Sequence, residues 1–205
     1  MFPHSNCDGE FSQQCSSSQK GSKSQKTGLS NTNLKGTHDL ALTLGGETDL
    51  WLVGYMDSDW ANCLDTRRSV EGFGFTLGAG LISWNAKKQK TIASSSCEAE
   101  YTAAFKASKE AIWLRTLLTE LKFLYPTTSM TILCNNNTAI CLSSDPAMHS
   151  CVKHINIQYH FLRERVQNKK LKISYVNTRD NIANIFTKAL TPGPFTQLCS
   201  FGGLC

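Results

Sequence analysis

Residues 49–93 have the sequence DLWLVGYMDSDWANCLDTRRSVEGFGFTLGAGLISWNAKKQKTIA, and this stretch decides the fold class. Its first part alternates apolar and polar residues, which predicts a strand. One face of that strand carries Trp51, Val53, Tyr55 and Asp57. The same alternation predicts a second strand over 72–78 and a third over 81–93, joined by a short glycine-rich turn. Three successive strands with short links predict an antiparallel meander.

Helix and strand patterns alternate after the meander. Ser95 with Glu98 is a capping-box pattern, and it predicts the start of a long helix with one apolar stripe. The stripe consists of Ala103, Ala107, Ala111, Leu114, Leu118 and Leu121. The later elements expected are a strand at 130–134, a helix from near Asn137, a helix at 154–166, a strand at 171–176 and a helix at 180–190. This succession predicts an α/β domain in which helices pack on a mixed sheet.

Changes in composition suggest the domain boundaries. Residues 1–34 are rich in Ser, Gln, Lys and Asn, which predicts a disordered low-complexity tail. The packed domain is expected over 48–192, after a short segment at 35–47, and residues 193–205 are expected to form a C-terminal tail. The 205 residues are 40% hydrophobic and 18% charged, which is normal for a globular domain. The net charge of +5 is compatible with a nucleic-acid partner without establishing one.

The nine cysteines include no CxxC pair, and neither a signal peptide nor a membrane-spanning apolar run is visible. We therefore expect reduced thiols, no membrane partner, and an intracellular protein of the cytoplasm or nucleus. His149, Cys151, His154 and His160 lie close together in the sequence. Their spacing matches no strong zinc pattern, so surface or packed histidines are the preferred interpretation.

Two acidic residues stand out by their positions. Asp57 ends a strand, where it could cap the following turn or bind a metal ion. Glu100 lies three residues before Ala103 on the apolar stripe and is predicted to point inward, whereas Glu98 is predicted to point outward. Glu100 could act as an anion at the helix N-terminus or as a metal ligand, and both interpretations stay open. Carboxylates from a strand end and a helix start could together bind Mg²⁺.

Basic residues occur in the turn after the first predicted strand and within the third. They are Arg67, Arg68, Lys87, Lys88 and Lys90. This group could bind the phosphates of a nucleic acid, or it could be a solvated strand end. Trp60 and Trp84 could stack on a sugar or base, but burial in the core is the preferred interpretation.

Six motifs occur in a fixed order: DSDWA (57–61), DTRRS (65–69), SWNAKKQK (83–90), EAEY (98–101), KHINIQYHF (153–161) and IFTK (185–188). Over about residues 35–192 the chain resembles the ribonuclease H domain of copia-type retrotransposon Pol polyproteins, and residues 35–47 resemble a remnant of the connector after the reverse transcriptase. The resemblance implies a ribonuclease H-like α/β fold, a five-stranded mixed sheet flanked by helices. It also implies hydrolysis of the RNA strand of RNA–DNA hybrids with two Mg²⁺ ions. The hybrid and the reverse transcriptase region are the implied partners, and contact with the hybrid backbone becomes the preferred interpretation of the basic group.

Four carboxylates hold the two ions in this family. The resemblance places the first on Asp57 and the second on Glu100. The third position, usually the aspartate of CDNQ, is Asn135 in this chain, and the fourth, usually the aspartate of LADIF, is Asn184. An asparagine keeps a carbonyl oxygen but carries no charge.

With two of the four carboxylates replaced, the resemblance implies loss of metal occupancy and absent or strongly impaired hydrolysis. Asp57 and Glu100 remain as the expected metal ligands. Two alternatives stay open. One is an active hydrolase with a reduced metal site, in which Asp59 or Asp180 substitutes for a missing ligand. The other is a non-catalytic nucleic-acid-binding module.

Overall fold

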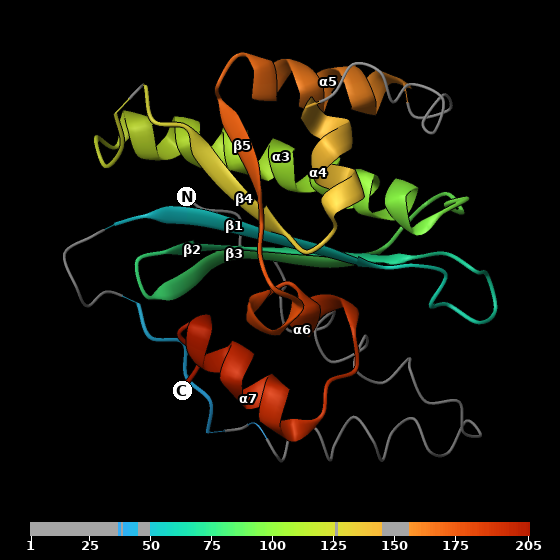
Figure 1. Cartoon of the computed structure of the whole chain (residues 1–205). Helices are drawn as coiled ribbons and strands as arrows, with labels where there is room; N and C mark the ends of the chain where they lie inside the picture. The colour runs from blue at the N-terminus through green and yellow to red at the C-terminus, as the bar shows by residue number, and fades with distance from the viewer. Residues whose placement is uncertain (1–36, 38, 45–49, 126, 145–155) are drawn as a thin grey trace.

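A computed structural model of the chain describes residues 37, 39–44, 50–125, 127–144 and 156–205. Five strands form one sheet in the order β3-β2-β1-β4-β5 (Figure 1). They are β1 (Leu52–Asp59), β2 (Val70–Leu77), β3 (Gly80–Lys88), β4 (Met130–Cys134) and β5 (Leu171–Tyr175). β2 pairs antiparallel with β1 and β3, while β4 pairs parallel with β1 and β5. The predicted meander and the mixed sheet are both confirmed.

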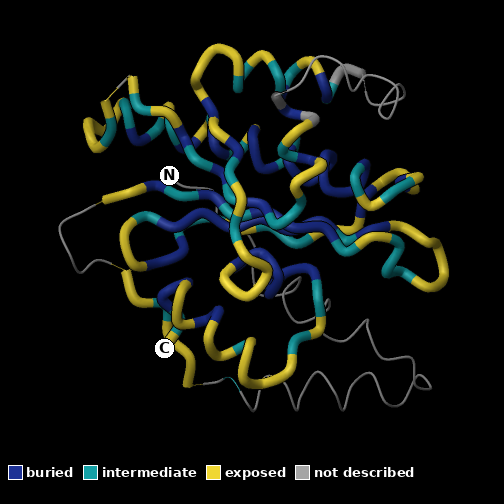
Figure 2. Tube along the Cα trace, viewed as in Figure 1, coloured by how far each residue is buried: buried dark blue, intermediate teal, exposed yellow. Residues whose placement is uncertain are grey.

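Helices cover both faces of the sheet. On one face lie α3 (Ser96–Glu120), α4 (Asn137–Ser144) and α5 (Asn156–Gln167), and on the other lie α6 (Asn184–Thr187) and α7 (Pro192–Phe201) (Figure 1). A 3-10 turn, η3 (Thr178–Asp180), leads from β5 towards α6. The larger apolar cluster lies under α3 and includes Met56, Phe75 and Ile132. The smaller cluster, built around Leu81 and Phe186, lies under α6 and α7, so buried segments line both sides of the sheet (Figure 2).

The start of α3 confirms one prediction and corrects another. The hydroxyl of Ser95 caps the helix by accepting from the backbone N–H of Glu98 at 3.2 Å. Glu98 was expected to point outward, which is wrong, because its side chain is only 5% exposed. Its carboxylate turns back to accept from the backbone N–H and the hydroxyl of Ser94, at 2.7 and 2.6 Å. At the other end, Leu121 is 56% exposed because it is the C-cap, beyond the last buried turn.

The continuous helix predicted over 180–190 is wrong, since only η3 and the short α6 form in this region. Asn181 interrupts it. The side-chain carbonyl of this fully buried residue accepts from the backbone N–H of Ala183 at 3.1 Å. Its amide nitrogen donates to the backbone carbonyl of Met56 at 2.9 Å. An asparagine that bonds to nearby backbone competes with the helix, and here it also ties the segment to β1.

The packed unit extends beyond the boundary expected at residue 192. Within 193–205, which were expected to form a tail, α7 buries Leu198 and Cys199 in the smaller apolar cluster. Leu204 then forms an isolated antiparallel bridge with Leu42, from the segment that precedes the sheet. The two ends of the described chain therefore lie beside each other and next to β3. The bond to this strand runs from the Leu81 N–H to the Gly202 carbonyl, at 2.9 Å.

Some predictions fall outside the described residues. These are the disordered tail at 1–34 and the positions of His149, Cys151 and His154. His160 is described and exposed, and the six described cysteines are free. In the described part of the chain, no helix combines the length and apolar character needed to cross a membrane.

We expect Asn181→Ala to lower the free energy of unfolding by about 2 kcal/mol, because it leaves the buried Met56 carbonyl without its donor. Urea denaturation with an unchanged m-value measures the loss. Asn177→Ala is the matched control, since the side chain of Asn177 also caps a turn, by accepting from the N–H of Arg179, but is exposed. Equal losses in the two variants would contradict this role for Asn181.

Candidate active site

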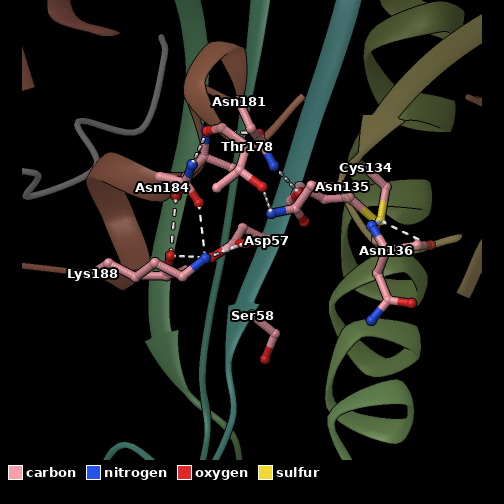
Figure 3. Close-up of polar contacts among 12 residues, drawn as sticks. Asp57, Ser58, Cys134, Asn135, Asn136, Thr178, Asn181, Asn184 and Lys188 are labelled. Carbon is pink, nitrogen blue, oxygen red and sulfur yellow. Dashed lines mark hydrogen bonds and ion pairs between the residues drawn. The ribbon is translucent and has the colours of Figure 1, made fainter. Parts of the chain in front are cut away.

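The four positions mapped onto metal ligands lie at one end of the sheet. Asp57 is fully buried near the carboxyl end of β1, and Glu100, in the first turn of α3, is 6% exposed. Asn135 directly follows β4, and Asn184 is the first residue of α6. The carboxyl ends of β1 and β4 meet at the same edge because these strands are parallel. Figure 3 shows Asp57 lying between Asn184, from α6 on one side, and Asn135, from the end of β4 on the other.

Both carboxylate oxygens of Asp57 have partners from the end of α6. The hydroxyl of Thr187 donates to Oδ2 through a short hydrogen bond. The ammonium group of Lys188 donates to Oδ1 at 2.8 Å and also to the side-chain carbonyl of Asn184 at 3.0 Å (Figure 3). Asp57 is therefore neutralised by a lysine, and Asn184 provides that lysine with a second acceptor.

The two asparagines also use their amide nitrogens. The side chain of Asn135 donates to the hydroxyl of Thr178 at 3.2 Å. The side chain of Asn184 donates to the backbone carbonyl of the same residue at 2.6 Å. An ionised aspartate has no hydrogen to donate at either place. The two asparagines therefore hold η3 in place through hydrogen bonds that an ionised carboxylate could not donate.

Glu100 is the most perturbed acid of the site. Burial, and next to it the nearby charge of Asp57, raise its pKa to about 8, against the opposing effects of Lys188 and a bond from the Ser58 backbone N–H. Its Oε2 is buried and has no hydrogen-bond partner among the described residues, and the same holds for Oδ1 of Asn135. The prediction that Glu100 points inward is confirmed.

The donor set does not fit two divalent ions. Two Mg²⁺ ions carry four positive charges, whereas Asp57 and Glu100 supply at most two negative charges and Lys188 adds a positive one. Across the described ranges, no three or more His, Cys, Asp and Glu side chains are grouped so that they could hold a metal ion. Asp180 is exposed, and burial raises the pKa of Asp59, with Asp57 adding to and Lys188 opposing that effect. Neither completes such a group.

The predicted basic residues come together beside this edge, and all five are exposed. Pairing aligns Asp57 with Gly72 and Gly72 with Ala86, so Lys87 and Lys88 lie two strands from Asp57. That separation is about 10 Å from the spacing of neighbouring strands. Arg67 and Arg68 join them because the N–H of Gln89 donates to the carbonyl of Ser69 at 2.8 Å. These residues, with Lys90, are called the basic group below.

Lys88 also has a partner within the chain. Its ammonium group donates to the sulfur of Cys63 at 3.0 Å. This bond, with further donors from Thr66, lowers the pKa of the Cys63 thiol to about 6. The loop over 60–69 and the end of β3 are therefore held together by the polar contact as well as by the backbone.

The preferred interpretation of Trp60 and Trp84 as core residues is wrong, since they are 48% and 37% exposed. Trp60 directly follows β1 and so lies beyond the sheet, although its indole N–H is fixed by the carbonyl of Ala93 at 3.1 Å. Trp84 is on β3, which is an edge strand. Trp60 therefore escapes burial because it lies beyond the end of β1, and Trp84 because it lies on an edge strand.

Sequence reasoning missed Thr187 and Lys188, which make the direct contacts to Asp57. A signal was available, because Lys188 follows Asn184 by four residues, the spacing at which two side chains lie on the same side of a helix. Thr178, which fastens both asparagines, had no comparable signal.

The strand order β3-β2-β1-β4-β5, with helices on both faces of the mixed sheet, is the ribonuclease H-like fold that the sequence predicts. Among solved structures, the N-terminal ribonuclease H domain of a Mycobacterium tuberculosis protein, fused to maltose binding protein, is similar with a TM-score of 0.49. That similarity covers 73% of this chain and 96% of the other, at 11% sequence identity. No protein-family model matches the chain.

Sequence relatives of the chain are retrovirus-related Pol polyproteins of plant transposons. The chain is 40% identical over 166 residues to the retrovirus-related Pol polyprotein from transposon TNT 1-94 of Nicotiana tabacum, covering 81% of this chain and 12% of the relative. It is also 40% identical over 167 residues to the Pol polyprotein from transposon RE1 of Arabidopsis thaliana, covering 82% of this chain and 11% of the relative. The chain is a homologue of copia-type retrovirus-related Pol polyproteins. It spans about 12% of the length of these relatives.

Proposed function

We propose that this chain is a retrotransposon-derived ribonuclease H-like domain that binds RNA–DNA hybrids and has lost all or nearly all Mg²⁺-dependent hydrolysis. One observation carries the proposal. Asparagines occupy two of the four mapped ligand positions, and Lys188 bridges one of them to Asp57. In the family that the chain resembles, the corresponding four carboxylates hold two ions that promote attack of water on phosphorus.

The energetic cost of the missing charges supports the loss of hydrolysis. A pair of unit charges about 4 Å apart interacts by roughly 4 kcal/mol at an effective dielectric constant of 20, and a divalent ion doubles that value. Even after generous discounting for solvent, the binding free energy lost with two carboxylates exceeds roughly 1.4 kcal/mol. That amount corresponds to a tenfold change in a rate or binding constant. Metal occupancy at physiological Mg²⁺ should therefore collapse, while the fold loses only electrostatic repulsion.

Binding does not require the missing carboxylates. The basic group is exposed and lies beside the site, where it could contact the phosphates of a hybrid. A wide minor groove with 2′-hydroxyls would distinguish a hybrid from duplex DNA. This favours non-catalytic nucleic-acid binding as the function that remains. The reverse transcriptase region of a parent polyprotein is the second partner we propose, with the cytoplasm or nucleus as the place of action.

The test is a fluorescence-anisotropy titration of a labelled RNA–DNA hybrid in EDTA. We expect Arg67→Gln with Arg68→Gln to raise the Kd for the hybrid about tenfold. The number of counterions released on binding, measured from the salt dependence of the Kd, should fall by about two. Lys169→Gln with Lys170→Gln is the matched control, because these exposed lysines precede β5, at the opposite end of the parallel strands. A parent protein that does not bind hybrid, or equal losses in both double variants, would contradict the proposal.

A further inference from the structure

The ammonium group of Lys188 lies within the candidate site. Its side chain is 32% exposed, whereas the Asp57 side chain with which it pairs is fully buried. Two oxygens, one from Asp57 and one from Asn184, accept from the same nitrogen at 2.8 and 3.0 Å (Figure 3). A cation thus bridges two of the positions that the family uses to bind metal.

The local fold explains why the lysine points inward. α6 ends at Thr187, and Lys188 is its C-cap in extended conformation, with its backbone N–H donating to the carbonyl of Asn184 at 3.0 Å. The hydroxyl of Thr187 is also bonded to Asp57, so two successive side chains approach the same carboxylate. Backbone and side-chain bonds therefore act together to hold the ammonium group at this place.

This arrangement competes with a divalent ion. A buried carboxylate needs a positive partner, and Lys188 already provides one for Asp57. A metal ion placed beside Asp57 would be repelled by the ammonium group and would have to displace it. IFTK is part of the motif set shared with the family, so the lysine alone does not distinguish this chain. The distinguishing feature is the lost charge at Asn135 and Asn184, which removes the attraction that would favour a metal ion over the lysine.

We propose that Lys188 is the resident cation of this site: it holds Asp57 in place of a divalent ion and makes the folded state independent of divalent cations. The inference rests on the proposed function in that it concerns the same damaged site. Its test measures metal binding and stability, not hydrolysis, so the two can fail separately. If divalent ions do not stabilise the protein but it still cleaves the hybrid, only the proposed function is overturned.

The first experiment compares thermal unfolding of the full chain in EDTA and in about 1 mM MnCl₂, a concentration at which an ion that binds the folded state raises the midpoint. We expect no shift for the unaltered protein or for Lys188→Arg, which keeps the cation. Lys188→Met should unfold at a lower temperature in EDTA and regain at least about 3 °C with Mn²⁺. Adding Asp57→Asn to Lys188→Met should abolish that gain. An equal Mn²⁺ shift in the unaltered protein, or no shift in folded Lys188→Met, would overturn the proposal.

A second measurement covers the case in which Lys188→Met does not fold. Electron paramagnetic resonance of free Mn²⁺ reports binding directly to the unaltered protein. We expect its signal to be the same with the unaltered protein and with Asp57→Asn. Binding by the unaltered protein that Asp57→Asn removes would show that Lys188 does not keep the metal out, and would overturn the proposal.

Discussion

Restoring both aspartates, Asn135→Asp together with Asn184→Asp, should raise the rate of Mg²⁺-dependent hybrid cleavage at least about 100-fold over the unaltered protein. The double variant regains four carboxylates around the ends of β1 and β4, which can balance the charge of two divalent ions and compete with Lys188. Time courses with a labelled hybrid, at equal concentrations of folded protein, measure the effect.

The single variants should differ. Asn135→Asp should help more, because Asn135 directly follows a strand and does not touch Lys188. Asn184→Asp alone would give Lys188 a second carboxylate and strengthen its hold on the site. The double variant should exceed the combined single effects, since ligands of one site act together. Asn137→Asp, an exposed change of the same kind nearby, is the control and should have no effect. A folded double variant without activity would place the defect outside these ligands.

In EDTA at alkaline pH, Glu100→Gln should raise the free energy of unfolding by about 3 kcal/mol. This magnitude follows from the size of the pKa shift, reduced for solvent screening. The pKa of Glu100 is raised from 4.5 in its ordinary state to about 8 in the folded protein. The folded state therefore holds the proton more tightly than the unfolded state does. The associated stability is fully present below pH 4.5 and is lost as the pH rises through 8.

Urea denaturation from pH 4.5 to 9 in EDTA tests this expectation. The free energy of unfolding of the unaltered protein should fall across the interval, and the fall should be smaller in Glu100→Gln. The two proteins should be nearly equal at the acid end. Glu120→Gln, at the exposed end of α3, is the control and should follow the unaltered protein. Parallel curves for Glu100→Gln and the unaltered protein would contradict the account of this buried acid.

Much of the fold could be predicted because local patterns carry it. Period-two alternation located β1 and β2, and the serine cap located the start of α3. The apolar stripe of α3 also showed that Glu100 points inward. These features depend on neighbours within a few residues, so the sequence contains them directly.

The rest depends on contacts between distant segments. Asn181 bonds to Met56, 125 residues away in the chain, and this contact helps to end the predicted last helix. Glu98 is buried because the preceding chain folds over its carboxylate. Lys188 reaches Asp57 across 131 residues, and its four-residue spacing from Asn184 indicates only the contact with Asn184. The mapped ligand positions could be found by resemblance, but the side chains that contact them, from Thr178, Thr187 and Lys188, could not.

The most direct test of the central claim is the cleavage of a labelled RNA–DNA hybrid by the unaltered protein, with Mg²⁺ and then with Mn²⁺. An active ribonuclease H serves as the positive control, and the double variant Asn135→Asp with Asn184→Asp shows that the preparation can support activity. We expect the hybrid to remain intact with either ion, although the protein binds it. Robust metal-dependent cleavage, abolished by Asp57→Asn, would contradict the proposed loss of hydrolysis.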